Sequence, residues 1–146
     1  MKWQGQFQPK HPEKYIGDPT KIFFRSSWEM QVMFWLDKTK SVVCWSSEEV
    51  VIPYRCPTDN KIHRYFVDFL IKLDNGKTLL VEVKPNRNLV KPKRKKYQKQ
   101  AKFIREVFTY TKNLAKFNAA KVYAEKRGWK FEVWTEDMLH DLGMIT

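Results

Sequence analysis

Cysteine and glycine are scarce in this chain, with two and five residues among 146. Cys44 and Cys56 form no C-x-x-C motif, and a disulfide framework or a zinc site would need more ligands at tighter spacing. Both cysteines are therefore expected to be ordinary thiols in a reducing cytosol. With 42% apolar residues and so little glycine, the sequence predicts one folded domain with a real core rather than a tail.

Long apolar runs are also missing. No stretch of about 18 uncharged apolar residues occurs, so a membrane span is not expected. The basic start of the chain lacks the apolar segment of a secretory signal, so no such signal is predicted. The sequence also shows no internal repeat and no sign of a second domain.

Acidic residues are outnumbered, with 16 Asp and Glu against 28 Lys and Arg, which gives a net charge of +12. Such an excess on a small domain favours a polyanionic partner, most often nucleic acid, although acidic proteins and lipid surfaces also bind basic proteins. The excess is clustered in residues 84–99, which contain no acid. The cations there are Lys84, Arg87, Lys91, Lys93, Arg94, Lys95, Lys96 and Lys99. We interpret this segment as phosphate-binding rather than as a solvated helix face.

The first 20 residues form an irregular arm in our interpretation, because prolines interrupt them and no period is visible. Trp3, Phe7 and Tyr15 indicate that the arm packs on the domain or on a partner. Residues 21–146 are expected to form the domain. Its first helix begins at Ser26, where Glu29 three residues later completes a capping box, and ends near residues 38–40.

Strands and a long helix follow in the remaining sequence. Strands are expected at residues 41–45 and from Val50, the second limited by Pro53. A hairpin follows at residues 64–85, then a helix from Lys93 to Gly128 that residues 109–111 could divide in two. Its apolar face is predicted to consist of Tyr97, Ala101, Ile104, Phe108, Thr111 and Ala115. A strand at residues 130–134 and a short helix after Thr135 close the chain. The pattern predicts a single α/β domain, a mixed central sheet flanked by helices in the order α-β-β-β-α-β.

Charged residues interrupt the two apolar strands of the hairpin. Side chains alternate between the faces of a strand, so Glu82 and Lys84 share one face. The position of Asp68 depends on the turn. A two-residue loop, Asn75 and Gly76, would direct Asp68 away from Glu82. A three-residue loop with Gly76 in the left-handed conformation would place Asp68 opposite Glu82, and we predict this loop.

Two carboxylates facing each other in a sheet repel unless a cation lies between them. Mg²⁺ or Mn²⁺ takes oxygen ligands of this kind and polarises a bound phosphate. A neighbouring lysine can orient or deprotonate the attacking water. Asp68, Glu82 and Lys84 thus suit phosphodiester hydrolysis. The plainer alternative is an acid at an exposed strand edge and a solvent-facing charge pair.

These residues resemble the motif of the PD-(D/E)XK nuclease superfamily, in which an Asp on one strand precedes E-x-K on the next. The matching residues are Asp68 and then Glu82-Val83-Lys84, while Val67 stands where the motif nominally has Pro. The superfamily adds a Glu from the first helix, here Glu29. The resemblance implies a restriction-endonuclease-like core in which Glu29, Asp68 and Glu82 bind Mg²⁺ or Mn²⁺ and Lys84 assists the water.

The stretches FRSSWE, RYFVDF, LLVEVKP and GWKFEVWTEDML are similar to the head-completion nucleases of tailed phages, and more distantly to the end-cleaving endonucleases of cut-and-paste transposons. The similarity covers residues 21–142. It implies a DNA endonuclease that acts on the filled phage head after packaging, in the host cytoplasm or as part of the virion. DNA would be one partner and portal or capsid proteins others, with no membrane involved.

Two rival hypotheses stay open. One is a non-cleaving head protein that binds DNA ends or the portal and keeps the nuclease fold as a scaffold. The other is a junction-resolving or restriction-type nuclease with the same core. For each, the seven cations after Lys84 would bind DNA: Arg87, Lys91, Lys93, Arg94, Lys95, Lys96 and Lys99.

Overall fold

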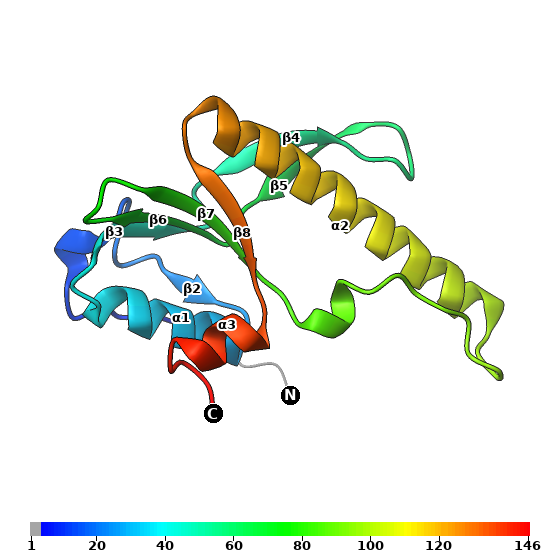
Figure 1. Cartoon of the computed structure of the whole chain (residues 1–146), viewed down its shortest axis with the longest axis horizontal. Coiled ribbons are helices and arrows are strands. Elements are labelled where there is room, and N and C mark those ends of the chain that lie inside the picture. Colours follow the sequence, from blue (N-terminus) through cyan, green and yellow to red (C-terminus); the bar gives the residue numbers. More distant parts are fainter. Residues whose placement is uncertain (1–3) are drawn as a thin grey trace.

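Four strands form the central sheet, in the spatial order β3-β6-β7-β8 (Figure 1). The computed structural model describes residues 4–146. These strands are β3 (Val42–Ser47), β6 (Phe69–Leu73), β7 (Thr78–Val83) and β8 (Lys130–Trp134). The first three are antiparallel neighbours, whereas β8 runs parallel to β7. The mixed sheet with helices on its faces confirms the predicted α/β class.

Helices α1 (Ser27–Lys38) and α3 (Glu136–Asp141) lie on one face of this sheet (Figure 1). Ser26 is the N-cap of α1 as predicted, since the Glu29 amide donates to Ser26 Oγ at 3.2 Å. Val32, Met33 and Leu36 are fully buried in one core with Trp45, Ile71 and Trp134 of the sheet. Burial of these side chains fixes the orientation of α1 and hence of Glu29.

The arm contributes to the same core. Phe7 and Tyr15 are 3% and 7% exposed and pack on Trp45 with ring centroids 6.0 and 4.9 Å away. The arm contains β1 (Gly5–Gln6), which pairs with β2 (Phe23–Phe24), and the short helix η1 (Pro12–Lys14). Trp3 lies outside the described residues.

The opposite face is covered by a second pair of strands and the C-terminal half of the long helix. Strands β4 (Val51–Arg55) and β5 (Ile62–Phe66) pair only with each other and lie along α2 (Gln100–Lys126) (Figure 1). Their core comprises Ile52, Tyr54, Cys56, Tyr65, Val67, Leu70, Leu80, Ala120 and Ala124. Pro53 does not limit β4 as predicted, because β4 is an edge strand in which a missing N–H is tolerated.

The predicted three-residue turn is confirmed. The Leu73 amide donates to the Lys77 carbonyl at 2.8 Å, Gly76 has φ +85°, and Leu70 lies opposite Leu80. This is the register that predicts Asp68 opposite Glu82, although the ladder itself stops one pair earlier, at Phe69 opposite Val81. Asp68 lies just beyond the end of the ladder.

Two strands were predicted for residues 64–85, but this range contains the end of β5 together with β6 and β7. Strand β5 ends at Phe66, the chain bends at Val67 and Asp68, and β6 then continues in the central sheet. The bend is held by backbone hydrogen bonds, from the Val67 amide to the Val50 carbonyl and from the Glu48 amide to the Asp68 carbonyl, both 3.1 Å. Asp68 therefore occupies the crossing between the two sheets.

The long helix differs from the prediction in its start, its continuity and its apolar face. It begins at Gln100 rather than Lys93 and runs unbroken through residues 109–111. The chain before it forms a short helix, η2 (Asn86–Asn88), and then a turn in which the Lys95 amide donates to Gln98 Oε1 at 3.1 Å. Eight cations with no acid to pair with disfavour a helix there. Among the described residues, no helix is long and apolar enough to cross a membrane.

Only the C-terminal end of the predicted apolar face of the long helix reaches the core, where Ala115 packs against it. Tyr97, Ile104 and Phe108 are 90%, 42% and 50% exposed. The buried residues of α2 are Asn113, Ala120 and Ala124, because the N-terminal half extends past the sheet (Figure 1). Both cysteines are free thiols, as predicted.

Candidate active site

Asp68 and Glu82 lie together where the two sheets meet. Glu82, in β7, is only 7% exposed, and Asp68 is partly buried in the bend before β6. The Val83 amide donates to Asp68 Oδ2 at 2.9 Å, which directs the aspartate carboxylate toward the end of β7. The two acids thus share one side of the sheet although they are not ladder partners.

Lys84 is on the same side as Glu82, as strand alternation predicts. Its Nζ lies 3.4 Å from Glu82 Oε2. The Lys84 amide donates to the Trp134 carbonyl at 2.9 Å, which fixes the backbone directly after β7. Asp68, Glu82 and Lys84 therefore form one cluster of two carboxylates and an amine.

The electrostatics of this cluster favour a bound cation. Burial raises the pKa of Asp68 well above its ordinary value, and the charges of Glu82 and Glu29 raise that pKa further. Carboxylates that repel one another in this way gain most from a divalent ion with a preference for oxygen ligands. Asp68 and Glu82 are oxygen donors of the kind that Mg²⁺ or Mn²⁺ prefers, but the carboxylates of Glu29, Asp68 and Glu82 do not all lie within 4.8 Å of one another.

Glu29 lies at the edge of the cluster. Its Oε2 accepts a hydrogen bond from Ser26 Oγ at 3.1 Å, so the N-cap hydroxyl holds the carboxylate. Burial raises the pKa of Glu29, and the charge of Glu48 adds to this effect. Glu29 is close enough to influence the pKa of Asp68, yet its carboxylate is held by Ser26.

Three residues near the cluster were not identified from the sequence. The buried Tyr65 hydroxyl donates to Glu82 Oε1 at 2.8 Å, and burial and the Glu82 charge raise the pKa of Tyr65. Lys116 of α2 has its pKa lowered by burial and by Lys84, while Glu82 opposes the shift. Glu48 is partly buried with φ +56°, and its backbone amide donates to the Asp68 carbonyl. Only the folded chain brings these residues beside the acids.

A cleft of about 710 Å³ extends from Lys84 between the basic segment and α2. Arg87 and Lys95 line it from the segment, and Lys102 and Arg105 line it from the helix. All seven predicted DNA-binding cations are exposed, namely Arg87, Lys91, Lys93, Arg94, Lys95, Lys96 and Lys99. Lys102 and Arg105 were missed because sequence spacing does not show that α2 folds back over the segment.

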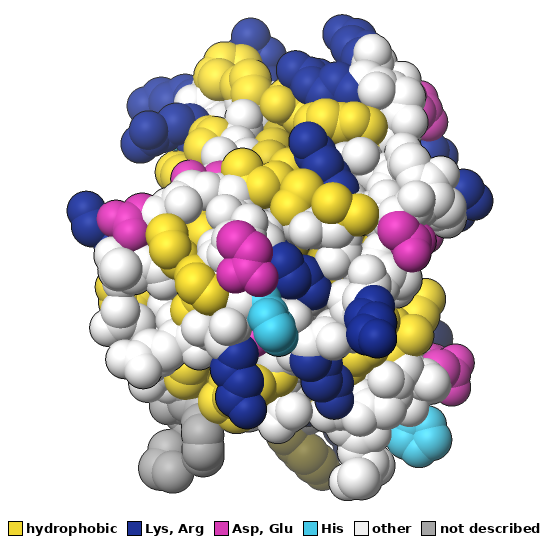
Figure 2. All heavy atoms as spheres, turned by 90° about the vertical axis from the view of Figure 1, so that its left-hand side faces the viewer, with side chains coloured by type: hydrophobic (Ala, Val, Ile, Leu, Met, Phe, Trp, Pro, Cys, Tyr) yellow, Lys and Arg dark blue, Asp and Glu magenta, His cyan; other side chains and the backbone are white. Residues whose placement is uncertain are grey.

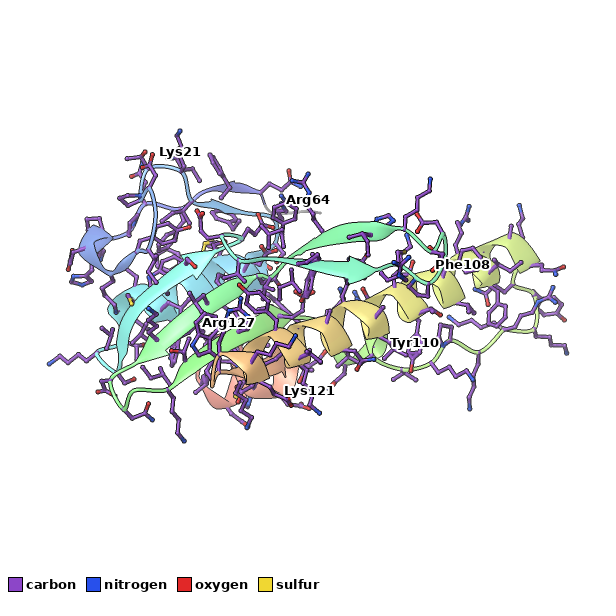
Figure 3. The ribbon with its side chains drawn as sticks, turned by 90° about the horizontal axis from the view of Figure 1, so that it is seen from above. Lys21, Arg64, Phe108, Tyr110, Lys121 and Arg127 are labelled. Carbon is purple, nitrogen blue, oxygen red and sulfur yellow. The ribbon has the colours of Figure 1, made fainter. Side chains whose placement is uncertain are left out.

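Figure 3 views this arrangement from above, with Phe108 and Tyr110 on the part of α2 that extends past the sheet. Tyr110 belongs to the cleft lining together with Thr109 and Asn113. Lys and Arg side chains are also scattered over the end of the molecule opposite the cleft (Figure 2), so the positive charge is not confined to the cleft.

Two comparisons with known proteins found similar chains. Residues 39–136 match the TnsA-like endonuclease N-terminal family, a span that contains Asp68, Glu82 and Lys84. The chain is also similar to the head completion nuclease of Enterobacteria phage T4. The two are 41% identical over 146 residues, which is 98% of this chain and 97% of that protein.

Proposed function

The chain belongs to the TnsA-like endonuclease N-terminal family, and on this premise we propose that it is a metal-dependent DNA endonuclease that hydrolyses phosphodiester bonds. One observation carries the proposal. Asp68, Glu82 and Lys84 form a cluster at the mouth of a basic cleft, with Lys84 lining that cleft. The carboxylates that favour a metal ion therefore lie next to the Lys and Arg side chains that favour phosphates.

Each residue has a distinct task in this proposal. Asp68 and Glu82, with Glu29, would hold Mg²⁺ or Mn²⁺, which when bound polarises the phosphate and acidifies water. Tyr65 fixes one oxygen of Glu82 and leaves the other toward Lys84, because Oε1 accepts from Tyr65 and Oε2 lies near the amine. Lys84 Nζ orients the attacking water and balances charge on the phosphate.

The cleft holds the DNA backbone beside these groups. Arg87 and Lys95 approach it from one side and Lys102 and Arg105 from the other, so phosphates on either side of the scissile bond have cationic partners. Cations of this kind would contact the phosphate backbone rather than the bases, which supports cleavage without strong base preference.

Similarity to the T4 head completion nuclease supports a role in phage head completion after DNA packaging. In this role the protein acts in the host cytoplasm during assembly or within the virion, and portal or capsid proteins are its further partners. The similarity extends over nearly the whole length of both chains, which supports a shared task.

Cleavage of linear and branched DNA with Mg²⁺ tests the proposal. We expect the wild-type chain to cut, and Asp68→Ala and Lys84→Ala to lose at least about 100-fold in rate. Asp74→Ala, in the exposed β6–β7 turn, should cut like wild type and controls for general effects. Unchanged cleavage in both site variants would reject the assignment. Metal-independent DNA binding with no cutting would favour the non-cleaving scaffold, and a preference for four-way DNA a junction resolvase.

A further inference from the structure

The loop that joins β4 to β5 brings together a thiol, a carboxylate and an imidazole. These belong to Cys56, Asp59 and His63, whose ligand atoms all lie within 4.8 Å of one another. The group has donors unlike the carboxylates of the proposed nuclease site, and it lies on the hairpin rather than in the central sheet. Its spacing is Cys-x₂-Asp-x₃-His, with the last residue already in β5.

The backbone of the loop fixes these side chains in place. The Cys56 amide donates to the Lys61 carbonyl and the Asn60 amide to the Cys56 carbonyl, each at 2.8 Å. Asn60 adopts φ +59°, which closes the turn. Asp59 Oδ1 accepts from the Lys61 amide at 3.0 Å. An ion bound here would therefore have little chain left to order.

The burial of the three donors matches an ion that enters from solvent. Cys56 is fully buried, while the side chains of Asp59 and His63 are 40% and 41% exposed. The sulfur thus lies beneath the two exposed donors. Its hydrogen-bonding contact is Thr58 Oγ1, 3.1 Å away.

We propose that Cys56, Asp59 and His63 bind one Zn²⁺ ion and leave its fourth coordination position to water. Zn²⁺ accepts sulfur, nitrogen and oxygen together in a tetrahedral set, whereas Mg²⁺ does not favour thiolates. His63 Nε2 and Asp59 Oδ2 are 2.7 Å apart as a hydrogen-bonded pair. Ligands about 2.0 Å from zinc at a tetrahedral angle are about 3.3 Å apart, so these exposed groups need to separate by about 0.6 Å.

Bound zinc would cross-link the loop at the tip of the β4–β5 hairpin. The same hairpin carries Tyr65, which bonds Glu82, and leads into the bend that holds Asp68. Zinc would therefore stabilise the frame of the acid cluster without joining the reaction. Without an ion, Asp59 accepts from the Lys61 amide and pairs with His63. Spectroscopy can distinguish this metal-free form from the zinc-bound form.

Cobalt substitution in the tag-free, chelator-stripped chain tests the proposal. Co²⁺ bound by a thiolate gives a sulfur-to-metal charge-transfer band, and we expect one equivalent to produce it and Zn²⁺ to abolish it. Cys44→Ser should keep the band, and Cys56→Ser should lose it. Asp68→Asn should also keep the band, which separates this site from the proposed nuclease site.

A second variant guards against misfolding of Cys56→Ser, since that residue is buried. His63→Gln changes a partly exposed side chain and should weaken Co²⁺ binding at least about tenfold while circular dichroism stays unchanged. Zn²⁺ should raise the Tm of wild type and Cys44→Ser, but not of Cys56→Ser. Absence of a thiolate band in the wild-type chain, or its survival in Cys56→Ser, would overturn the proposal. Neither result would bear on DNA cleavage.

Discussion

Tyr65 and Glu82 are joined across two sheets, because the phenol of β5 donates a 2.8 Å hydrogen bond to the carboxylate of β7. Both side chains are buried, so neither has water as an alternative partner. The bond fixes the orientation of the acid at the candidate active site and ties the β4–β5 hairpin to the central sheet.

Tyr65→Phe should destabilise the fold by about 2 kcal/mol, because a hydrogen bond to a buried charged group is lost. The variant should also need a higher Mg²⁺ concentration for cleavage, since Glu82 is no longer held in one orientation. Urea unfolding and the Mg²⁺ dependence of cleavage measure the two effects. Tyr97→Phe is the matched control, because Tyr97 is 90% exposed. Equal unfolding midpoints for the two variants would contradict the importance of this bond.

Cleavage at limiting Mg²⁺ should increase with pH. The pKa of Asp68 is raised by burial and by Glu82, and the ion binds only the deprotonated carboxylate. Higher Mg²⁺ should shift the pH–rate profile toward lower pH, because the metal competes with the proton. Initial rates across pH at two Mg²⁺ concentrations check this. A profile that does not move with Mg²⁺ would argue against Asp68 as a ligand.

Asp68→Asn should stabilise the metal-free protein at neutral pH. A carboxyl whose folded pKa is raised binds more protons in the folded state than in the unfolded state. Stability is then lost as pH rises from the unfolded pKa through the folded pKa, and the amide removes this loss. Thermal melts in chelator at acidic and neutral pH would show a Tm difference from wild type that grows with pH. Asp74→Asn, in an exposed turn, should show none.

Lys116→Ala should weaken DNA binding and cleavage about tenfold, because it removes a partly buried cation that faces Glu82 and Lys84. Lys121→Ala is the control on the same helix, since Lys121 is exposed. If Lys116 supplies only charge for the phosphate, Lys116→Arg should restore most of the activity. Equal rates for the two alanine variants would remove Lys116 from the site.

The combined change of Lys95, Lys102 and Arg105 to Ala should reduce the salt dependence of duplex binding. Each lost phosphate contact lowers the slope of log K against log salt by about 0.9, so a decrease of about 2 to 3 is expected. Exposed lysines away from the cleft, Lys40, Lys72 and Lys77, provide a triple control of similar charge loss. Fluorescence anisotropy across salt concentrations gives both slopes. Identical slopes would place the DNA elsewhere.

Local sequence rules were sufficient for the parts of the site that lie on one strand or one turn. Alternation places Glu82 beside Lys84, and Gly76 specifies the turn that sets the β6–β7 register. The capping box likewise identifies the start of α1 at Ser26. In each case the determining residues are within a few positions of one another, so periodicity and turn chemistry are enough.

The remaining features depend on contacts between distant segments. Nothing near Asp68 in sequence shows that β5 pairs with β4 and that the chain then changes sheets. Tyr65 and Lys116 reach Glu82 only because the hairpin and α2 pack over the same face. The apolar pattern of residues 97–115 also misled, since Ile104 and Phe108 satisfy helical spacing without being buried. Periodicity reports which side chains share a face and not what that face contacts.

Because the chain crosses between two sheets at Asp68, the number of residues in the crossing matters for the site as much as the identity of the acid. Phe66 ends one ladder and Phe69 begins the other, so two residues span the gap and the second is the acid. An insertion at this link would rotate the carboxylate away from Glu82 with every side chain still present. Homologues can therefore be expected to keep the length of this two-residue link unchanged.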